Sequence, residues 1–133
     1  MLKKFLIVDD DERFTALVAK KLSEYAQCVV SNRGDDALLQ FEHHMREGTP
    51  FYAVFMDIEM PQMDGHEAIE RMRSIENNNK IDPRNAFKLI MLTAHDDVKN
   101  VSKSFFKGHA ETYICKSNLH EKLIPELQAN KII

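Results

Sequence analysis

The sequence has few cysteines and no long hydrophobic run. No apolar stretch approaches the roughly 18 residues that a membrane-spanning helix needs, and the first four residues lead directly into a strand-like segment, unlike a signal peptide. The two cysteines, Cys28 and Cys115, accompany no CxxC motif and no Cys/His cluster, which argues against a redox or zinc site. We therefore expect a cytoplasmic protein in which both cysteines are reduced and buried.

The chain also lacks a long block of one charge. It carries 18 basic and 21 acidic residues, for a formal net charge of -3. Nucleic-acid and membrane surfaces attract extended basic patches, so we expect no direct contact with either and a protein as the partner. The length of 133 residues and the apolar content of 44% suit a single domain over residues 1–133, without a separate output domain.

Short apolar runs alternate with amphipathic segments along the whole chain. The runs that predict strands cover residues 5–8, 28–30, 53–56, 87–92 and 112–115. Between them, apolar residues recur at helical spacing, for example over roughly 12–25 and at Val98, Val101 and Phe105. Such a pattern indicates an α/β fold, a doubly wound five-stranded parallel sheet with helices on both faces. The strand order that we expect is 2-1-3-4-5, one of the two common orders of doubly wound sheets. In this order the two cysteines lie at opposite edges, too far apart for a disulfide.

Two segments depart from this regular pattern. The polar stretch between Asn77 and Asn85, interrupted by Pro83, is longer than most connections in such units. We expect it to be an exposed loop and the segment most prone to disorder. Pro125 falls inside the last helical pattern, where it removes a hydrogen-bond donor, so it should kink or shorten that helix.

Five polar residues directly follow four of the predicted strands. They are Asp9 and Asp10 after the first, Asp57 after the third, Thr93 after the fourth and Lys116 after the fifth. Parallel strands carry their carboxyl ends on one edge, and ligands bind there where the strand order reverses. Three neighbouring carboxylates should raise a pKa or bind a hard cation such as Mg²⁺, while a hydroxyl and an ammonium can hold phosphoryl oxygens. The set predicts metal-assisted phosphoryl chemistry.

The sequence around these residues resembles response-regulator receiver domains. Four motifs carry the resemblance along essentially the whole chain: IVDDD at 7–11, FMDIEMPQMDG at 55–65, MLTA at 91–94 and YICK at 113–116. The resemblance implies the flavodoxin-like (βα)5 fold and a switch in two-component phosphorelay signalling. A sensor histidine kinase or phosphotransfer protein would supply the phosphoryl group, and a downstream protein would read it. The chain would be a monomer or weak dimer.

The resemblance also implies roles for individual acidic residues. Asp57 would accept the phosphoryl group and slowly lose it again by autocatalysis, without making the chain an enzyme in the usual sense. Asp9 and Asp10 would hold Mg²⁺, or Mn²⁺ in its place, directly or through water. Asp57 and the backbone carbonyl of Glu59 would complete the metal site.

Three further residues would sense the phosphoryl group. Thr93 and Lys116 would contact its oxygens, and the ring of Tyr113 would turn inward as Thr93 moves. The family usually has proline after this lysine, whereas this chain has Ser117. A cis bond before a residue other than proline costs about 2.5 to 4 kcal/mol, so we expect a trans Lys116–Ser117 bond and an altered loop after the fifth strand.

Other interpretations of the acidic residues are open. Asp10 or Asp11 alone could cap the first helix. The Asp-x-Asp arrangement of Asp9 and Asp11 is similar to that of haloacid dehalogenase-type phosphohydrolases, in which Asp9 would be the nucleophile. The following Glu12 and Arg13, the lack of room for a cap domain and an Asp57 without a role argue against that family. A receiver fold that no longer signals by phosphorylation is a further alternative.

Overall fold

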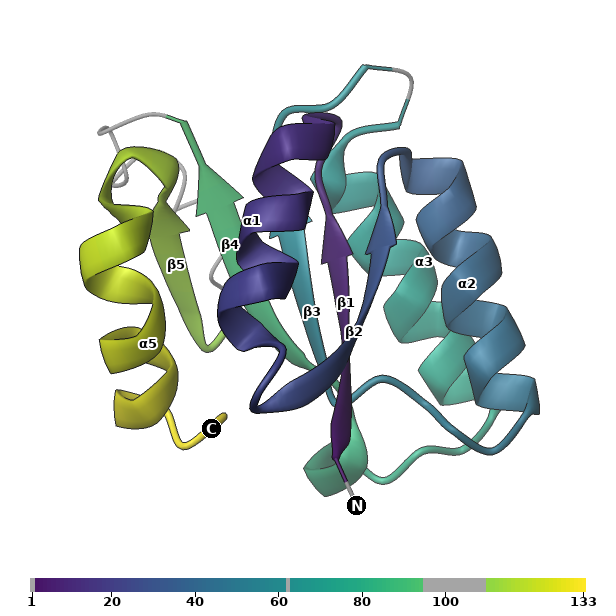
Figure 1. The fold of residues 1–133 in the computed structure, drawn as a ribbon. Coiled ribbons are helices and arrows are strands. Elements are labelled where there is room, and N and C mark those ends of the chain that lie inside the picture. Colours follow the sequence, from purple (N-terminus) through teal and green to yellow (C-terminus); the bar gives the residue numbers. More distant parts are fainter. Residues whose placement is uncertain (1, 62, 95–109) are drawn as a thin grey trace.

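A parallel sheet forms the centre of the molecule (Figure 1), a computed structural model that describes residues 2–61, 63–94 and 110–133. Its five strands follow the order β2-β1-β3-β4-β5. They are β1 (Lys3–Val8), β2 (Ala26–Ser31), β3 (Ala53–Asp57), β4 (Lys88–Thr93) and β5 (Thr112–Cys115). All four strand pairs are parallel, so the predicted fold class and strand order are confirmed. The order reverses between β1 and β3, which is where the predicted carboxylates lie.

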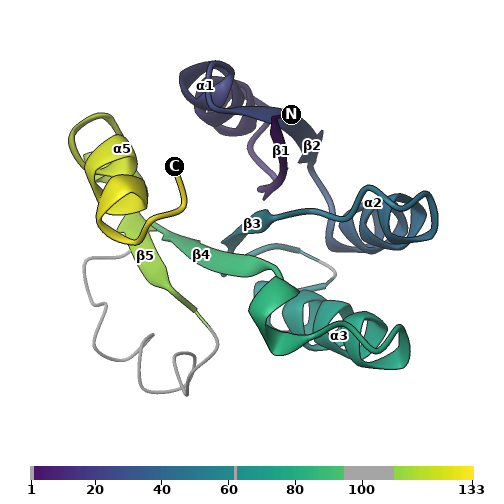
Figure 2. The ribbon, with the colours of Figure 1, turned by 90° about the horizontal axis from the view of Figure 1, so that it is seen from below.

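Helices cover both faces of the sheet. They are α1 (Glu12–Leu22), α2 (Gly34–Arg46), α3 (Gly65–Asn78) and α5 (Leu119–Ala129), with short 3-10 turns η1 (Pro83–Asn85) and η2 (Lys116–Asn118). Figure 2 shows α1 and α5 on one side of the sheet and α2 and α3 on the other. The expected helix containing Val98, Val101 and Phe105 lies outside the described residues.

The alternating side chains of β1 show how the sheet builds two cores. Phe5 and Ile7 pack with residues of α1 and α5, whereas Leu6 and Val8 pack with residues of α2 and α3. All four side chains are fully buried. Successive residues of a strand point to opposite faces, so a strand covered on both sides must be apolar throughout. This requirement explains the continuous apolar runs of the sequence.

The connection from α3 to β4 corrects the expectation of disorder. The N–H of Ile81 donates to the Glu76 carbonyl at 3.0 Å, and the polar stretch then forms η1. Glu76 is 4% exposed, and its Oε2 accepts the N–H of Phe87 at 2.8 Å. Arg73 contacts Oε1 of Glu76 and donates to the Phe87 carbonyl, both at 2.9 Å. A buried carboxylate thus ties the end of the connection to α3, while most of residues 77–85 are exposed as predicted.

Pro125 was expected to kink or shorten its helix, and the structure contradicts the shortening. The helix α5 continues through it to Ala129, and Pro125 itself is exposed. Water can therefore bond the carbonyl of Glu121, which loses its amide partner. The Lys116–Ser117 bond is trans, and Cys28 and Cys115 are free, both as expected. Cys115 is buried as predicted, but Cys28 is only partly buried because β2 is an edge strand of the sheet.

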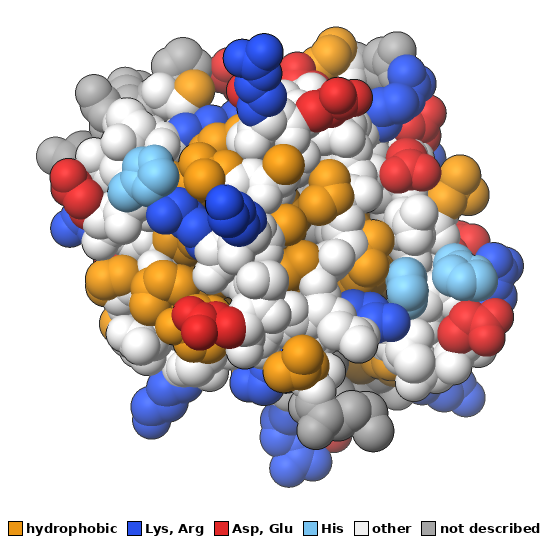
Figure 3. Space-filling view, viewed as in Figure 1, with side chains coloured by type: hydrophobic (Ala, Val, Ile, Leu, Met, Phe, Trp, Pro, Cys, Tyr) orange, Lys and Arg blue, Asp and Glu red, His pale blue; other side chains and the backbone are white. Residues whose placement is uncertain are grey.

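The surface carries both charges side by side. On the face drawn in Figure 3, acidic and basic side chains are interspersed and form no large area of one sign. Within the described segments, no helix is both long enough and apolar enough to cross a bilayer.

Candidate functional site

Three carboxylates meet at the carboxyl ends of β1 and β3. Asp9 and Asp10 follow β1, and Asp57 is the last residue of β3. One carboxylate oxygen from each lies within 4.8 Å of the other two. Asp9 and Asp57 are 0% and 3% exposed, whereas Asp10 faces solvent. The structure therefore brings together the three carboxylates that the sequence placed at this edge.

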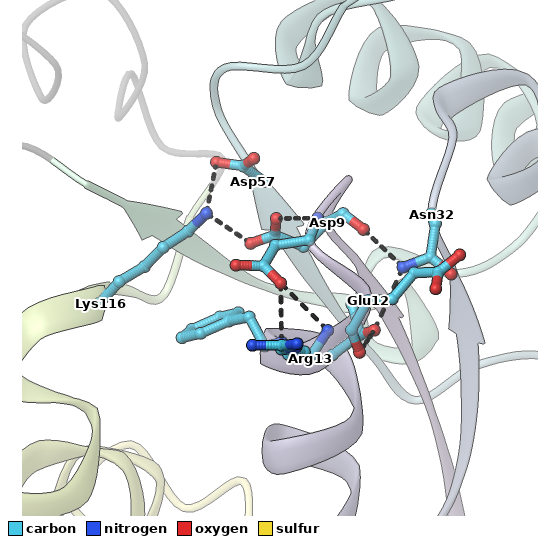
Figure 4. Close-up of polar contacts among 9 residues, drawn as sticks. Asp9, Glu12, Arg13, Asn32, Asp57 and Lys116 are labelled. Atoms are coloured by element: carbon cyan, nitrogen blue, oxygen red, sulfur yellow. Dashed lines mark hydrogen bonds and ion pairs between the residues drawn. The ribbon is translucent and has the colours of Figure 1, made fainter.

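The Lys116 side chain reaches from the end of β5 into this cluster (Figure 4). Its Nζ lies 2.5 Å from Oδ2 of Asp9 and 3.4 Å from Oδ1 of Asp57. The same ammonium lies 5.0 Å from the ring centroid of Phe14 in α1, within the range of a cation-π contact. Lys116 therefore reaches the carboxylates even though serine follows it.

The electrostatics of the cluster follow from burial and from the neighbouring charges. Burial and then the Asp9 charge raise the pKa of Asp57 to about 7, against the opposing effect of Lys116 and the Glu59 backbone N–H. Burial also raises the pKa of Asp9, although Lys116 and the Asp11 N–H favour its charged form. Burial lowers the pKa of Lys116, but the two carboxylates raise it more, so the net shift is upward. One ammonium does not balance the carboxylates, and an additional cation would stabilise their charged forms.

Asp11, the third aspartate of the IVDDD motif, is a helix cap and not part of the carboxylate cluster. Asp11 is the N-cap of α1, and its Oδ1 accepts the N–H groups of Arg13 at 3.0 Å and Phe14 at 3.2 Å. Its own N–H donates to Oδ1 of Asp9 at 3.0 Å. Of the two candidate caps, Asp11 is the one that caps the helix. It also orients the Asp9 carboxylate.

The phosphoryl-sensing candidates lie farther along the same edge. Thr93 ends β4 and is 2% exposed, and it pairs in register with Cys115, the residue before Lys116. Tyr113 on β5 is 40% exposed, so its ring is not buried in this structure. The Glu59 side chain is also exposed. These positions leave the Glu59 side chain and the Tyr113 ring outside the buried cluster.

Two residues that the sequence argument missed also shape the site. A Cβ added to Gly65 would clash with the backbone carbonyl of Asp57, so this close approach requires glycine. Asn32, just after β2, donates from Nδ2 to the Asp9 carbonyl at 2.8 Å. A signal for Asn32 was present, since polar Ser31 and Asn32 also follow an apolar strand. No sequence signal revealed the close packing of Gly65 on Asp57.

Comparison with known proteins identifies the family. The sequence profile of the response regulator receiver domain matches residues 5–128. The chain belongs to the response regulator receiver domain family, which functions in two-component phosphorelay signalling.

Its similar curated proteins include plant histidine kinases. Probable histidine kinase 6 of Oryza sativa subsp. japonica is 40% identical over 77 residues, which cover 56% of this chain and 7% of the kinase. Histidine kinase CKI1 of Arabidopsis thaliana is 26% identical over 143 residues, which cover 97% of this chain and 12% of that kinase. The chain thus matches only a small part of these long relatives.

Solved structures share the same fold. The receiver domain of CKI1 complexed with Mg²⁺ and BeF3⁻ has a TM-score of 0.79 at 22% identity, covering 98% of this chain and 91% of that one. Chemotaxis protein CheY4 of Vibrio cholerae has a TM-score of 0.73 at 23% identity, covering 97% of this chain and 98% of that one.

Proposed function

We propose that Asp57 accepts a phosphoryl group and that the chain acts as a phosphorylation switch. The observation that carries this proposal is the position of Asp57, buried at the sheet edge beside two other carboxylates, with the Lys116 ammonium at 3.4 Å. A carboxylate oxygen is a competent nucleophile when positive charge and hydrogen-bond donors stabilise the phosphoryl oxygens. Lys116 and Thr93 are the residues proposed to supply that stabilisation.

The transfer conserves atoms and charge in two steps. An Asp57 carboxylate oxygen attacks phosphorus and forms an acyl phosphate, while the bond from phosphorus to the donor nitrogen of a phosphohistidine breaks and the imidazole leaves. Later a water molecule attacks phosphorus, inorganic phosphate departs and the Asp57 carboxylate is restored. The protein returns to its starting state, so this slow self-dephosphorylation resets the switch.

The same acidic cluster fits a divalent cation. Asp9, Asp10 and Asp57 offer an oxygen donor set with excess negative charge, which suits Mg²⁺, or Mn²⁺ in its place. The Glu59 backbone carbonyl would complete this set. When bound, the cation neutralises charge on the incoming phosphoryl oxygens. A receiver-domain structure of CKI1 complexed with Mg²⁺ supports the choice of metal.

The donor we propose is a histidine kinase or a phosphotransfer protein. The similarity to histidine kinases supports this class of donor. We further propose that residues 1–133 form one receiver domain, which makes no direct contact with nucleic acid and is a monomer or weak dimer. A protein target would read the phosphorylated state. Turning of the Tyr113 ring as Thr93 moves would alter the surface presented to this target.

A phosphohydrolase with Asp9 as nucleophile is disfavoured by the Asp9 contacts. Its Oδ1 accepts the Asp11 N–H, its Oδ2 pairs with Lys116, and its side chain is fully buried. An attacking oxygen must be able to reach phosphorus. Asp57 is 3% exposed and so has slight access from solvent, whereas Asp9 is 0% exposed and has none. The two functions also differ in turnover, since a switch is modified once whereas a hydrolase continues to consume organic phosphates.

Phosphorylation by a small-molecule donor tests the proposal. Protein incubated with phosphoramidate and Mg²⁺ should gain one phosphoryl mass, and EDTA should prevent the gain. Asp57→Asn should abolish it, whereas Asp82→Asn at an exposed site should not. Multiple turnover of organic phosphates that survives Asp57→Asn would contradict the switch. A wild-type protein that is never modified would indicate a receiver fold that no longer signals by phosphorylation.

A further inference from the structure

The end of β2 contacts the acidic loop through Asn32. The Asn32 Nδ2 donates to the Asp9 carbonyl at 2.8 Å and to Oγ1 of Thr15 at 3.1 Å. The Thr15 hydroxyl, 1% exposed, in turn donates to the Glu12 carbonyl at 3.0 Å. One side-chain amide thus joins β2, the loop after β1 and, through Thr15, the first turn of α1. Figure 4 shows the bond from Asn32 to Asp9.

The directions of these bonds are fixed by chemistry. A backbone carbonyl only accepts, so the amide nitrogen of Asn32 must face Asp9. The Thr15 oxygen accepts one amide hydrogen and uses its own hydrogen toward Glu12. Both Asn32 amide hydrogens therefore have an acceptor, one on the acidic loop at Asp9 and one in α1 at Thr15.

Asn32 hydrogen-bonds to Asp9 just beyond the end of the backbone pairing between β1 and β2. The register of β1 and β2 ends at Val8 and Ser31, and the Asp9 N–H makes a last backbone bond to the Ser31 carbonyl at 3.2 Å. The Asp9 carbonyl lies beyond this register, and Asn32 supplies its donor. Asp9 is consequently held to β2 through both its N–H and its C=O.

The bonded carbonyl belongs to the peptide unit that joins Asp9 to Asp10. That unit is planar, so a hydrogen bond that holds its oxygen also restrains the positions of the Asp10 nitrogen and Cα. Asp10 is exposed, so little packing restrains its side chain, whereas Asp9 is fully buried. The orientation of Asp10 toward Asp57 therefore depends on the backbone of this loop.

We propose that Asn32 is a positioning residue for the cation site. It holds the Asp9–Asp10 peptide in the orientation that keeps the Asp10 carboxylate within ligand range of Asp9 and Asp57, and Thr15 secures the same loop from α1. This inference rests on the proposed metal site. It adds the end of β2 to a site otherwise built from β1, β3, β4 and β5.

The affinity for Mg²⁺ tests the inference without reference to phosphorylation. Isothermal titration calorimetry of the metal-free protein, well below its melting temperature, should show Asn32→Ala weakening Mg²⁺ binding by about tenfold, the lower end of the loss when a group that supports metal ligands is removed. Asn32→Ser, which can still donate one hydrogen bond, should lose less. Thr15→Val, which lacks the hydroxyl, should weaken Mg²⁺ binding. Thr15→Ser, which keeps the hydroxyl, should bind Mg²⁺ with the wild-type affinity.

A matched control separates positioning from general stability. Asn130→Ala removes a similar bond, from Nδ2 to the Glu126 carbonyl at 2.8 Å, at the end of α5, and should leave the affinity unchanged. A purely structural Asn32 would lower the melting temperature but leave the Kd of the folded variants within twofold of wild type, which would overturn the inference. If Asn32→Ala fails to fold, Asn32→Ser and the Thr15 pair decide by the same criterion. Wild-type protein that binds no Mg²⁺ would instead refute the metal site, and this inference with it.

Discussion

Lys116 pairs with Asp9 more closely than with Asp57, at 2.5 Å against 3.4 Å. The ammonium therefore partly neutralises the buried metal-ligand candidate Asp9 and remains beside the proposed acceptor Asp57. A phosphoryl group on Asp57 would bring further negative charge to this ammonium. Lys116 can respond by a small movement of its flexible chain, without a change in the sheet.

Removing Lys116 should destabilise the metal-free protein. Lys116→Met leaves buried carboxylates without their cation, and breaking a buried pair costs about 3 to 5 kcal/mol. Because the Lys116 side chain is 21% exposed, we expect a smaller loss of about 2 kcal/mol in the free energy of unfolding. Urea denaturation in EDTA measures the loss, with Lys122→Met at an exposed site of α5 as the control.

Added Mg²⁺ should recover more stability in Lys116→Met than in wild type, because the cation then supplies the missing positive charge. Equal stability of Lys116→Met and wild type in EDTA would show that the ammonium does not stabilise the cluster.

The stability of the metal-free protein should depend on pH through Asp57. Its pKa of about 7 lies above the ordinary value of 3.8, so between these values the folded state keeps a proton that the unfolded state has lost. The Asp57 contribution to the free energy of unfolding therefore falls as the pH rises through this window and levels off above it. At about 1.36 kcal/mol per pH unit, the fall is at most about 4 kcal/mol.

Asp57→Asn isolates this contribution. The variant should gain stability relative to wild type as the pH rises from about 4 to about 7, measured by urea denaturation in EDTA. Mg²⁺ should reduce the difference, since a bound cation stabilises the charged carboxylate of the wild type. A stability difference that does not change with pH would contradict the raised pKa.

Gly65→Ala should disturb the site through the backbone. The added methyl group would meet the Asp57 carbonyl, and overpacking of this kind costs about 1 to 3 kcal/mol. We expect both a lower melting temperature and slower phosphorylation by phosphoramidate. Glu70→Ala, on the exposed side of α3, should alter neither. Unchanged phosphorylation in Gly65→Ala would mean that the Asp57 backbone can yield without moving its carboxylate.

Glu76→Ala should lower stability but leave the site intact. The substitution leaves the Phe87 N–H and Arg73 without their carboxylate partner, which costs about 1 to 3 kcal/mol for an unsatisfied buried group. These contacts precede β4, at the edge opposite to Asp57 and Thr93. Thermal unfolding should therefore show the loss, while calorimetric Mg²⁺ affinity stays at the wild-type value. A weakened affinity would reveal coupling across the sheet.

The strands and the gathering of the carboxylates were predictable because the apolar runs, and the polar residues that end them, are local to each segment. The strand order came instead from the known topologies of doubly wound sheets. A parallel strand buried on both faces must be apolar along its length, and its carboxyl end must point to the shared edge. Asp9, Asp10 and Asp57 are therefore visible in the sequence as polar residues that end apolar runs.

The sequence-based expectations that were wrong, and the residues that were missed, involve contacts between segments far apart in the chain. Glu76 lies in α3, just before the polar stretch, and its bond to the Phe87 N–H joins α3 to the far end of that stretch. The packing of Gly65 on Asp57 and the bond from Asn32 to Asp9 join different elements in the same way. Pro125 was expected to kink or shorten its helix because it removes a hydrogen-bond donor. The sequence did not show that Pro125 is exposed, where the helix continues past it. Local periodicity carries no information about such pairs.

The most direct test of the central claim is to locate the phosphoryl group. Protein treated with phosphoramidate and Mg²⁺ is reduced with borohydride, which converts an acyl phosphate to an alcohol, and its peptides are sequenced by mass spectrometry. The account predicts reduction at Asp57 in the Mg²⁺ sample and none in EDTA or in Asp57→Asn. Reduction at Asp9 instead of Asp57, or at neither residue, would contradict it.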